Sequence, residues 1–207
     1  MLVDLTVETR LKYEKPLRAI PSMMLDDEHD LALVRRMAAG EDAALCEIYA
    51  ACGQHLYAYA LRFTDDPAQA EDVVQDTLVA AWKSARKFRG EGRVLAWLLG
   101  IVHHTALKSL RHRSQPITDE MEATLETGSP SPEQQVEQVE QSARLRLGLR
   151  ALSPEHRAVL ELVFYQGLSL DEVAQVCRVP LGTVKSRLSY ARGQLRGVLT
   201  RQGLEEV

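Results

Sequence analysis

Two short helical segments joined by a tight turn are predicted in residues 168–195, and this pattern constrains the fold more than any other feature of the chain. Ser169 and Glu172 have the spacing of a capping box, which predicts that a helix begins at the residue after Ser169. Pro180 cannot continue that helix but suits the first turn of the next one, so the turn is expected at 177–180. This arrangement is typical of a helix-turn-helix, a unit that reads DNA.

The second helix of this unit is predicted to have one apolar face and one basic face. Its apolar residues recur at helical spacing and form one stripe for packing on the rest of the domain: Val184, Leu188, Ala191 and Leu195. The side chains expected to contact DNA are Thr183, Lys185, Ser186, Arg187 and Tyr190. No acidic residue occurs between Glu172 and Glu205, so this surface carries one sign of charge. An ordinary solvated amphipathic helix is the alternative interpretation.

Charge is segregated along the chain, although the net charge is only -4. Residues 83–113 contain eight Lys or Arg and one acid, residues 114–142 contain seven acids and no Lys or Arg, and residues 178–201 contain six basic residues and no acid. A slightly acidic protein does not coat DNA through its net charge. The distribution of charged residues along the chain therefore says more about DNA binding than the net charge does. This charge distribution predicts two basic segments joined by an acidic linker.

The predicted fold is all-α, with two small helical domains joined by a flexible acidic linker. We expect a flexible N-terminal extension at 1–28, a first domain at 29–113, the linker at 114–143 and a second domain at 144–201. Prolines, a glycine, seven acids and little apolar content are typical of a linker and predict the third of these segments. Met23 and Met24 directly precede the first helical pattern, which offers a second possible start of translation and leaves open whether residues 1–23 are translated.

One helix of the first domain has a face rich in carboxylates. Asp66 as N-cap and Pro67 at the first helical position predict where this helix begins. The apolar residues that follow form a broad buried face and leave Asp72, Gln75 and Asp76 outside. From periodicity alone, this outer face is expected to be merely solvated.

A second helix of the first domain has a basic surface. A loop with two glycines at 88–93 is predicted to lead into this helix, which is expected at 94–112. Cationic and aromatic side chains of the loop and helix suit phosphate binding and stacking on unpaired bases, and the candidates are Arg89, Arg93, Trp97, His103, His104, Lys108 and Arg111. For Trp97 taken alone, packing in the core is the simpler interpretation.

Other function classes find little support in the sequence. The three cysteines, Cys46, Cys52 and Cys177, form no CxxC pair, so we expect a reducing cytoplasm and no disulfide framework. The histidines and cysteines lack metal-ligand spacing, which predicts no metal site and no cofactor. No stretch approaches the ~20 apolar residues of a membrane span, so membrane insertion is not expected. Catalytic residues are not expected either, because paired carboxylates and a phosphate loop are missing from the sequence.

Three blocks of the sequence resemble the extracytoplasmic-function (ECF) group of bacterial sigma factors, which have only the second and fourth sigma regions. The blocks are AEDVVQDTLVAAWK at 70–83, FRGEGRVLAWLLGIV at 88–102 and SLDEVAQVCRVPLGTVKSRLSYAR at 169–192. Their common order, with an acidic segment between the second and third, is more specific than any one block. The resemblance implies a subunit that directs core RNA polymerase to promoters and is controlled by an anti-sigma factor.

The resemblance also implies roles for particular positions. Asp72, Gln75 and Asp76 would bind the clamp helices of the largest polymerase subunit, which replaces the solvated-face interpretation. The loop 88–94 and the helix after it would open the downstream, minus-ten promoter element and trap an extruded base. The helix-turn-helix would read the upstream, minus-thirty-five element. A contact with the flap of the second-largest subunit is implied as well, and the acidic linker would thread the nucleic-acid channel of the polymerase.

The chain departs from the family pattern at several of these positions. His103 and His104 stand where Arg and Asn are usual, Lys108 where Asp is common, and Gly100 where a larger polar residue is usual. In the helix-turn-helix, Arg178 occupies a turn position where Gly is frequent. These differences predict a divergent promoter sequence rather than a different function.

Two other functions are alternatives to a promoter-specificity subunit. A free-standing helix-turn-helix regulator would bind operator DNA through residues 168–195, but it would need a dimerisation element that the first domain does not offer. A nucleic-acid enzyme would need a catalytic cluster beside the basic surfaces.

Overall fold

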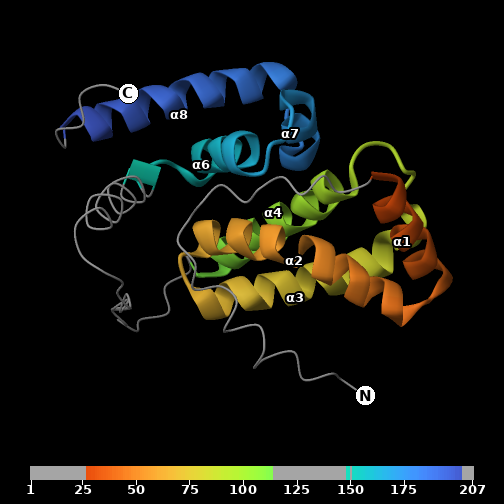
Figure 1. Cartoon of the computed structure of the whole chain (residues 1–207). Coiled ribbons are helices and arrows are strands. Elements are labelled where there is room, and N and C mark those ends of the chain that lie inside the picture. The colour runs from red at the N-terminus through yellow and green to blue at the C-terminus, as the bar shows by residue number, and fades with distance from the viewer. Residues whose placement is uncertain (1–26, 114–147, 150, 202–207) are drawn as a thin grey trace, which may run out of the picture.

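The computed structural model describes residues 27–113, 148–149 and 151–201, and these residues form helices, turns and loops without a β-strand (Figure 1). The all-α prediction is therefore confirmed for this part of the chain. The expected acidic linker at 114–143 lies outside the described residues, as does the expected N-terminal extension apart from residues 27 and 28, which begin the first helix.

Four helices and a short 3-10 turn make up the first domain. They are α1 (Asp27–Ala39), α2 (Asp42–Thr64), α3 (Pro67–Ser84), η1 (Ala85–Lys87) and α4 (Val94–Arg113). The long helices α2, α3 and α4 pack on one another, and α1 lies across them at one end (Figure 1). Fully buried Leu56, Tyr59, Leu98 and Leu99 fill the space between α2 and α4. Burial of large apolar side chains on facing helices is the main force that holds such a bundle together.

The start of α3 follows the predicted local chemistry. The Asp66 carboxylate accepts hydrogen bonds from the backbone N–H groups of Ala68 at 3.0 Å and Gln69 at 3.3 Å. Pro67 occupies the first helical position, where its missing N–H leaves no hydrogen bond unmade. The cap determines where α3 begins and therefore which of its residues face outward.

The second domain contains the predicted helix-turn-helix. It consists of α6 (Pro154–Leu160), the π-helical turn η2 (Glu161–Tyr165), α7 (Leu170–Cys177) and α8 (Leu181–Arg201). At the start of α7 the Glu172 N–H donates to Ser169 Oγ at 3.2 Å, and the Ser169 N–H donates to Glu172 Oε2 at 2.8 Å. The capping box and both predicted helix starts are confirmed. Arg178, in the turn, has a left-handed φ of 54°, which is why glycine suits that position.

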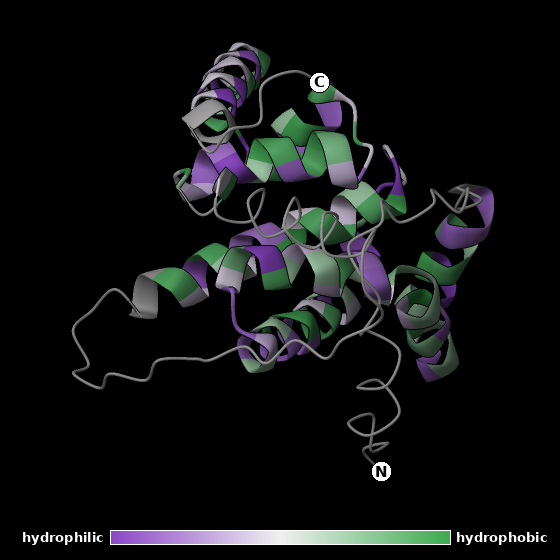
Figure 2. Cartoon of the chain, turned by 60° about the vertical axis from the view of Figure 1, so that its left-hand side comes forward, coloured by the Kyte–Doolittle hydropathy of each residue, from purple (hydrophilic) through white to green (hydrophobic). Residues whose placement is uncertain are grey.

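The two domains pack against each other, which the sequence pattern did not predict. Helix α7 lies on α4, and buried apolar residues of both domains form one continuous core. Figure 2 shows how hydrophobic and hydrophilic residues alternate along the helices, as amphipathic packing requires. This packing places the helix-turn-helix beside the basic helix of the first domain.

Candidate nucleic-acid interface

Helix α3 presents the predicted carboxylate-rich face to solvent. Asp72, Gln75 and Asp76 are exposed, while Val73 and Val74 on the opposite side are 3% and 4% exposed. Because the apolar side of α3 already packs on the bundle, its outer face contributes little to the stability of the domain. The three polar residues are free to bind a partner without disturbing the fold.

An exposed apolar residue, Val79, extends this face beyond the predicted polar residues. The Val79 side chain is 51% exposed. It lies four residues after Gln75 and three after Asp76, so all these side chains share one face of α3. We refer to Asp72, Gln75, Asp76 and Val79 together as the α3 stripe. The same helical spacing that placed the polar residues could have revealed Val79.

The predicted downstream surface follows the loop before α4 and the exposed side of that helix. Arg89 and Lys108 are exposed, and Arg93 is partly buried. The Trp97 ring is half-buried and stacks on Phe88, with ring centroids 4.7 Å apart. This stacking covers one face of the indole, so Trp97 supports the loop as well as lying at the surface. For Arg111, the structure describes the helical backbone and not the side chain.

The prediction that His103 faces DNA is wrong. Its side chain is 3% exposed and lies in the core, where Nδ1 is 2.8 Å from the Tyr59 hydroxyl oxygen. The Phe63 ring also packs edge-on against the imidazole, with centroids 5.6 Å apart. Burial, with smaller contributions from neighbouring His104 and Arg187, lowers the pKa of His103 to about 4. Periodicity placed this residue at the edge of the basic face, but packing by α2 and the second domain covers it.

His104, the residue after His103 in α4, points to a different side of the helix and is only partly buried. Its ring centroid is 5.2 Å from that of His103, in an edge-on arrangement. The two histidines therefore differ in environment although they are adjacent in sequence. Only His104 retains the partial exposure that contact with a base requires.

The buried His103 predicts a specific loss of stability in acid. Its pKa is about 4 in the folded chain against 6.5 for an ordinary histidine, so protonation favours the unfolded state. The stabilising contribution is complete above pH 6.5 and is lost as the pH falls toward 4, by about 3 kcal/mol at ~1.36 kcal/mol per pKa unit. Chemical denaturation of the wild type and His103→Gln between pH 7 and 4 should give a markedly smaller pH slope for the variant.

Exposed His29 on α1 offers the matched control for that measurement. His29→Gln should leave the pH slope of the unfolding free energy unchanged, because the His29 side chain is exposed and lies outside the buried cluster around His103. If His103→Gln and the wild type lost stability in parallel, His103 would not be the group responsible.

Helix α8 carries the candidates for reading the upstream element. Lys185, Ser186 and Tyr190 are exposed, whereas Thr183 and Arg187 are partly buried. The predicted apolar stripe packs inward, with Val184 and Ala191 fully buried, Leu188 8% exposed and Leu195 partly buried. Most of the α8 side chains that were expected to contact DNA are therefore exposed to solvent.

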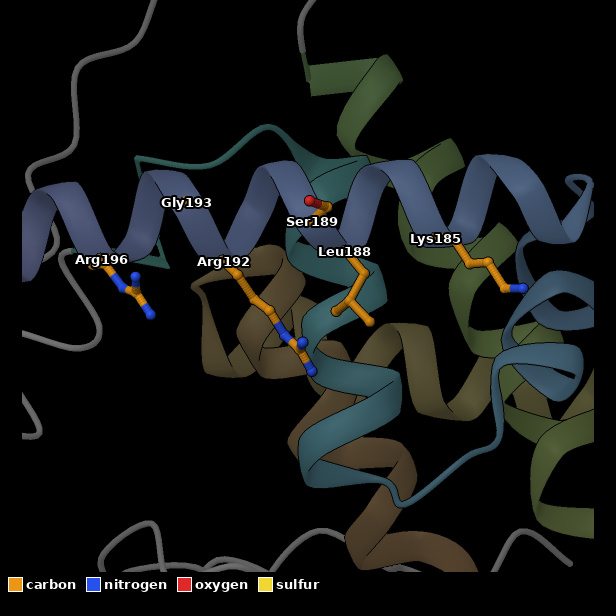
Figure 3. Close-up of a pocket in the computed structure, with 6 residues that line it drawn as sticks. All are labelled: Lys185, Leu188, Ser189, Arg192, Gly193 and Arg196. Carbon is orange, nitrogen blue, oxygen red and sulfur yellow. The ribbon is translucent and has the colours of Figure 1, made fainter.

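A groove of about 370 Å³ follows the basic side of α8. Figure 3 shows its lining residues, with long cationic side chains extending from one side of the helix: Lys185, Leu188, Ser189, Arg192, Gly193 and Arg196. Arg192 also lies over the Phe164 ring, 5.0 Å from the centroid. Helical spacing in the sequence already indicates Ser189 on the free face of this helix, with Arg192 and Arg196 on its flanks, and the groove brings these three side chains to one surface with Lys185, where cationic groups suit contact with a polyanion.

The described residues hold neither a metal-ligand cluster nor a helix of membrane-spanning type. Within them, no group of three or more His, Cys, Asp or Glu side chains could hold a metal ion. No helix among the same residues is long and apolar enough to cross a membrane.

Comparison with known proteins identifies the class of molecule that these helices form. Residues 48–115 match the family described as Sigma-70 region 2, and residues 148–197 match Sigma-70, region 4. The chain is 36% identical over 179 residues to the ECF RNA polymerase sigma factor SigL of Mycobacterium tuberculosis, covering 84% of this chain and 99% of that protein. It is 30% identical to the RNA polymerase sigma-H factor of Pseudomonas aeruginosa, covering 82% and 93% of the two chains.

Solved structures agree with these sequence matches. The structure of CnrH in complex with the cytosolic domain of CnrY matches with a TM-score of 0.63 and 26% identity, covering 83% of this chain and 97% of that one. RpoE from Bartonella quintana, in complex with the anti-sigma factor NepR, matches with a TM-score of 0.59 and 28% identity, covering 74% and 95%. The two-region architecture is that of a promoter-specificity subunit. The chain belongs to the ECF group of RNA polymerase sigma factors.

Proposed function

We propose that the α3 stripe binds core RNA polymerase, at the clamp helices of its largest subunit. The observation that carries this assignment is that three polar residues and an exposed valine share one face of a helix whose other face is in the core. A patch that combines exposed apolar and polar side chains on one face is typical of a protein interface. The clamp assignment comes from the likeness of 70–83 to the corresponding sigma region.

In this proposal each domain has its own role in promoter recognition. Residues 29–113 bind the core enzyme and open the minus-ten element, residues 144–201 read the minus-thirty-five element, and residues 114–143 connect them. The α8 surface around Lys185 and Tyr190 is exposed and basic, which suits base contacts bracketed by phosphate contacts. The second domain also contacts the flap of the second-largest subunit in this proposal.

For opening of the minus-ten element we retain the loop 88–94 and the exposed side of α4. Arg89, Arg93 and Lys108 hold phosphates, while Trp97 and His104 lie where an extruded base would be received. His103 is omitted because it is buried against Tyr59. Extruding a base costs a few kcal/mol of stacking, so both a pocket and nearby cations are needed.

We also propose control by an anti-sigma factor. The Bartonella quintana relative was crystallised with the anti-sigma factor NepR, and the match covers most of both chains. The chain itself supplies no catalytic residue in this proposal: it works in the cytoplasm as a dissociable subunit, and the polymerase performs the chemistry.

The test is in vitro transcription with purified core polymerase and genomic fragments. We expect discrete transcripts only when core enzyme and this protein are both present. A free-standing regulator, the alternative function, would instead bind fragments tightly without polymerase and would not change where the core enzyme starts. Binding of that kind without any new transcript would contradict the proposal.

A further inference from the structure

Tyr190 of α8 is an exposed aromatic residue whose side chain is held at two points. The residue is 55% exposed. Its ring packs against the ring of His156 in α6, with centroids 4.5 Å apart and the two planes tilted by 32°. Its hydroxyl oxygen accepts a hydrogen bond from Nε2 of Gln194, one helical turn further along α8, at 3.2 Å. A tyrosine that is held by both its ring and its hydroxyl loses little freedom when it binds a ligand.

His156 is itself held in place at the start of α6. Its Nδ1 lies 2.8 Å from Oγ of Ser153, the N-cap residue of that helix. Helix α6 packs on α8, and both helices contribute fully buried residues to the core, among them Ala158 and Val184. Two packed helices of the same domain therefore determine where the His156 ring meets Tyr190.

The side of α8 that carries Tyr190 differs from the side that lines the cationic groove. Lys185, Arg192 and Arg196 are among the residues that line that groove (Figure 3). At about 3.6 residues per turn, Tyr190 points away from these cations and shares a side of the helix with Arg187, three positions earlier. Helix α8 thus has a strongly cationic side and a second side on which an aromatic hydroxyl is exposed.

A carboxylate lies beside this second side of α8. Hydrogen bonding to its own backbone N–H, with contributions from neighbouring Arg187 and His156, lowers the pKa of Glu155. The Glu155 carboxylate is therefore close to two residues that flank Tyr190. A negative charge disfavours the approach of a phosphate, so the groove side of α8 suits the DNA backbone and the Tyr190 side suits the uncharged edge of a base.

The Tyr190 hydroxyl keeps its hydrogen for a further bond. A phenol has one O–H donor, and the contact with Gln194 uses the hydroxyl oxygen as acceptor, because an amide nitrogen only donates. In the major groove the acceptors on base edges are purine N7, guanine O6 and thymine O4. The second helix of a helix-turn-helix lies in that groove. Tyr190 is therefore arranged to donate to one of these acceptors.

We propose that His156 is a positioning residue for reading the upstream element: its ring holds Tyr190 so that the Tyr190 hydroxyl donates to one acceptor atom on a base edge. His156 acts through Tyr190 and does not itself contact the base. This role rests on the proposed assignment of α8 to the minus-thirty-five element. It adds a residue of α6, outside the helix-turn-helix, to those that determine promoter preference.

The test is in vitro transcription with core polymerase and the full chain, from templates that carry each single-base change of the upstream element. Tyr190→Phe keeps the ring and removes the donor, so it should reduce discrimination at one base pair about tenfold and leave the salt dependence unchanged. His156→Ala should reduce discrimination at the same base pair roughly threefold, because Tyr190 then has more freedom to lose. His156→Phe, which keeps an aromatic ring beside Tyr190, should restore it. His29→Ala, at an exposed position of α1, is the control and should keep the wild-type preference.

Two further measurements show whether His156 acts through Tyr190. In the Tyr190→Phe background, His156→Ala should cause no further loss of discrimination, because the hydroxyl that it positions is already gone. In NMR spectra of the free full-length chain, His156→Ala should shift the ring signals of Tyr190, which are identified by their loss in Tyr190→Phe. Circular dichroism should show the helicity of the wild type in each variant.

Wild-type base preference in both Tyr190→Phe and His156→Ala would overturn the proposal and leave the promoter-reading function intact. A reduced salt dependence in Tyr190→Phe, with equal loss on every template, would also overturn it, since that result indicates a phosphate contact. Unshifted Tyr190 ring signals in His156→Ala would exclude His156 as the positioning residue. If the wild type gave no transcript that depends on core enzyme, the proposed function would fail, and this role with it.

Discussion

Replacing Asp72, Gln75 and Val79 together by alanine is expected to weaken binding to core RNA polymerase by roughly 10- to 100-fold, at about 1.4 kcal/mol per tenfold. All three side chains lie on the exposed α3 stripe, and truncation at the centre of an interface removes most of the binding free energy that a few residues supply. Fluorescence anisotropy of the labelled chain titrated with core enzyme would measure the affinity directly.

Stability of the triple variant should remain close to that of the wild type. Exposed substitutions away from caps and cores usually change the unfolding free energy by about 0.5 kcal/mol or less. Asp42→Ala, which removes an exposed carboxylate from α2 instead, is the control for loss of negative charge and should bind core enzyme normally. An unchanged affinity for the triple variant would exclude the α3 stripe as the polymerase-binding surface.

The second large effect is expected at α8. Lys185→Ala should reduce promoter-dependent transcription about tenfold and lower the salt dependence of promoter binding by roughly one counterion, because an exposed lysine at the helix surface neutralises a phosphate. Arg187→Ala should instead relax the preference for one base of the upstream element if this partly buried guanidinium reads a base edge, a contact worth ~1 to 3 kcal/mol.

Arg35→Ala, which removes an exposed basic residue from α1, is the control for general charge loss and should alter neither quantity. Transcription from a set of single-base promoter variants, repeated at several salt concentrations, separates the two kinds of contact. Normal promoter preference and normal salt dependence in both α8 variants would leave this helix a purely structural element.

Local sequence signals predicted the helices and the outward faces well. Asp66 and Ser169 cap helices where their spacing to later residues indicated, because a cap depends on atoms only two or three residues away. The apolar stripe of α8 was equally local, since helical periodicity determines which side chains lie together. Asp72 and Lys185 could be placed at the surface for the same reason.

The all-α class, the helix-turn-helix and the likeness to two sigma regions follow from the amino-acid sequence alone. Tertiary packing, by contrast, is what buries His103 beside Tyr59 and pairs Arg62 with Glu161. Periodicity shows which side chains share a face, but it does not show which distant segment covers that face. Arg62 and Glu161 are 99 positions apart, and pairing over such a distance depends on how two separately specified domains pack.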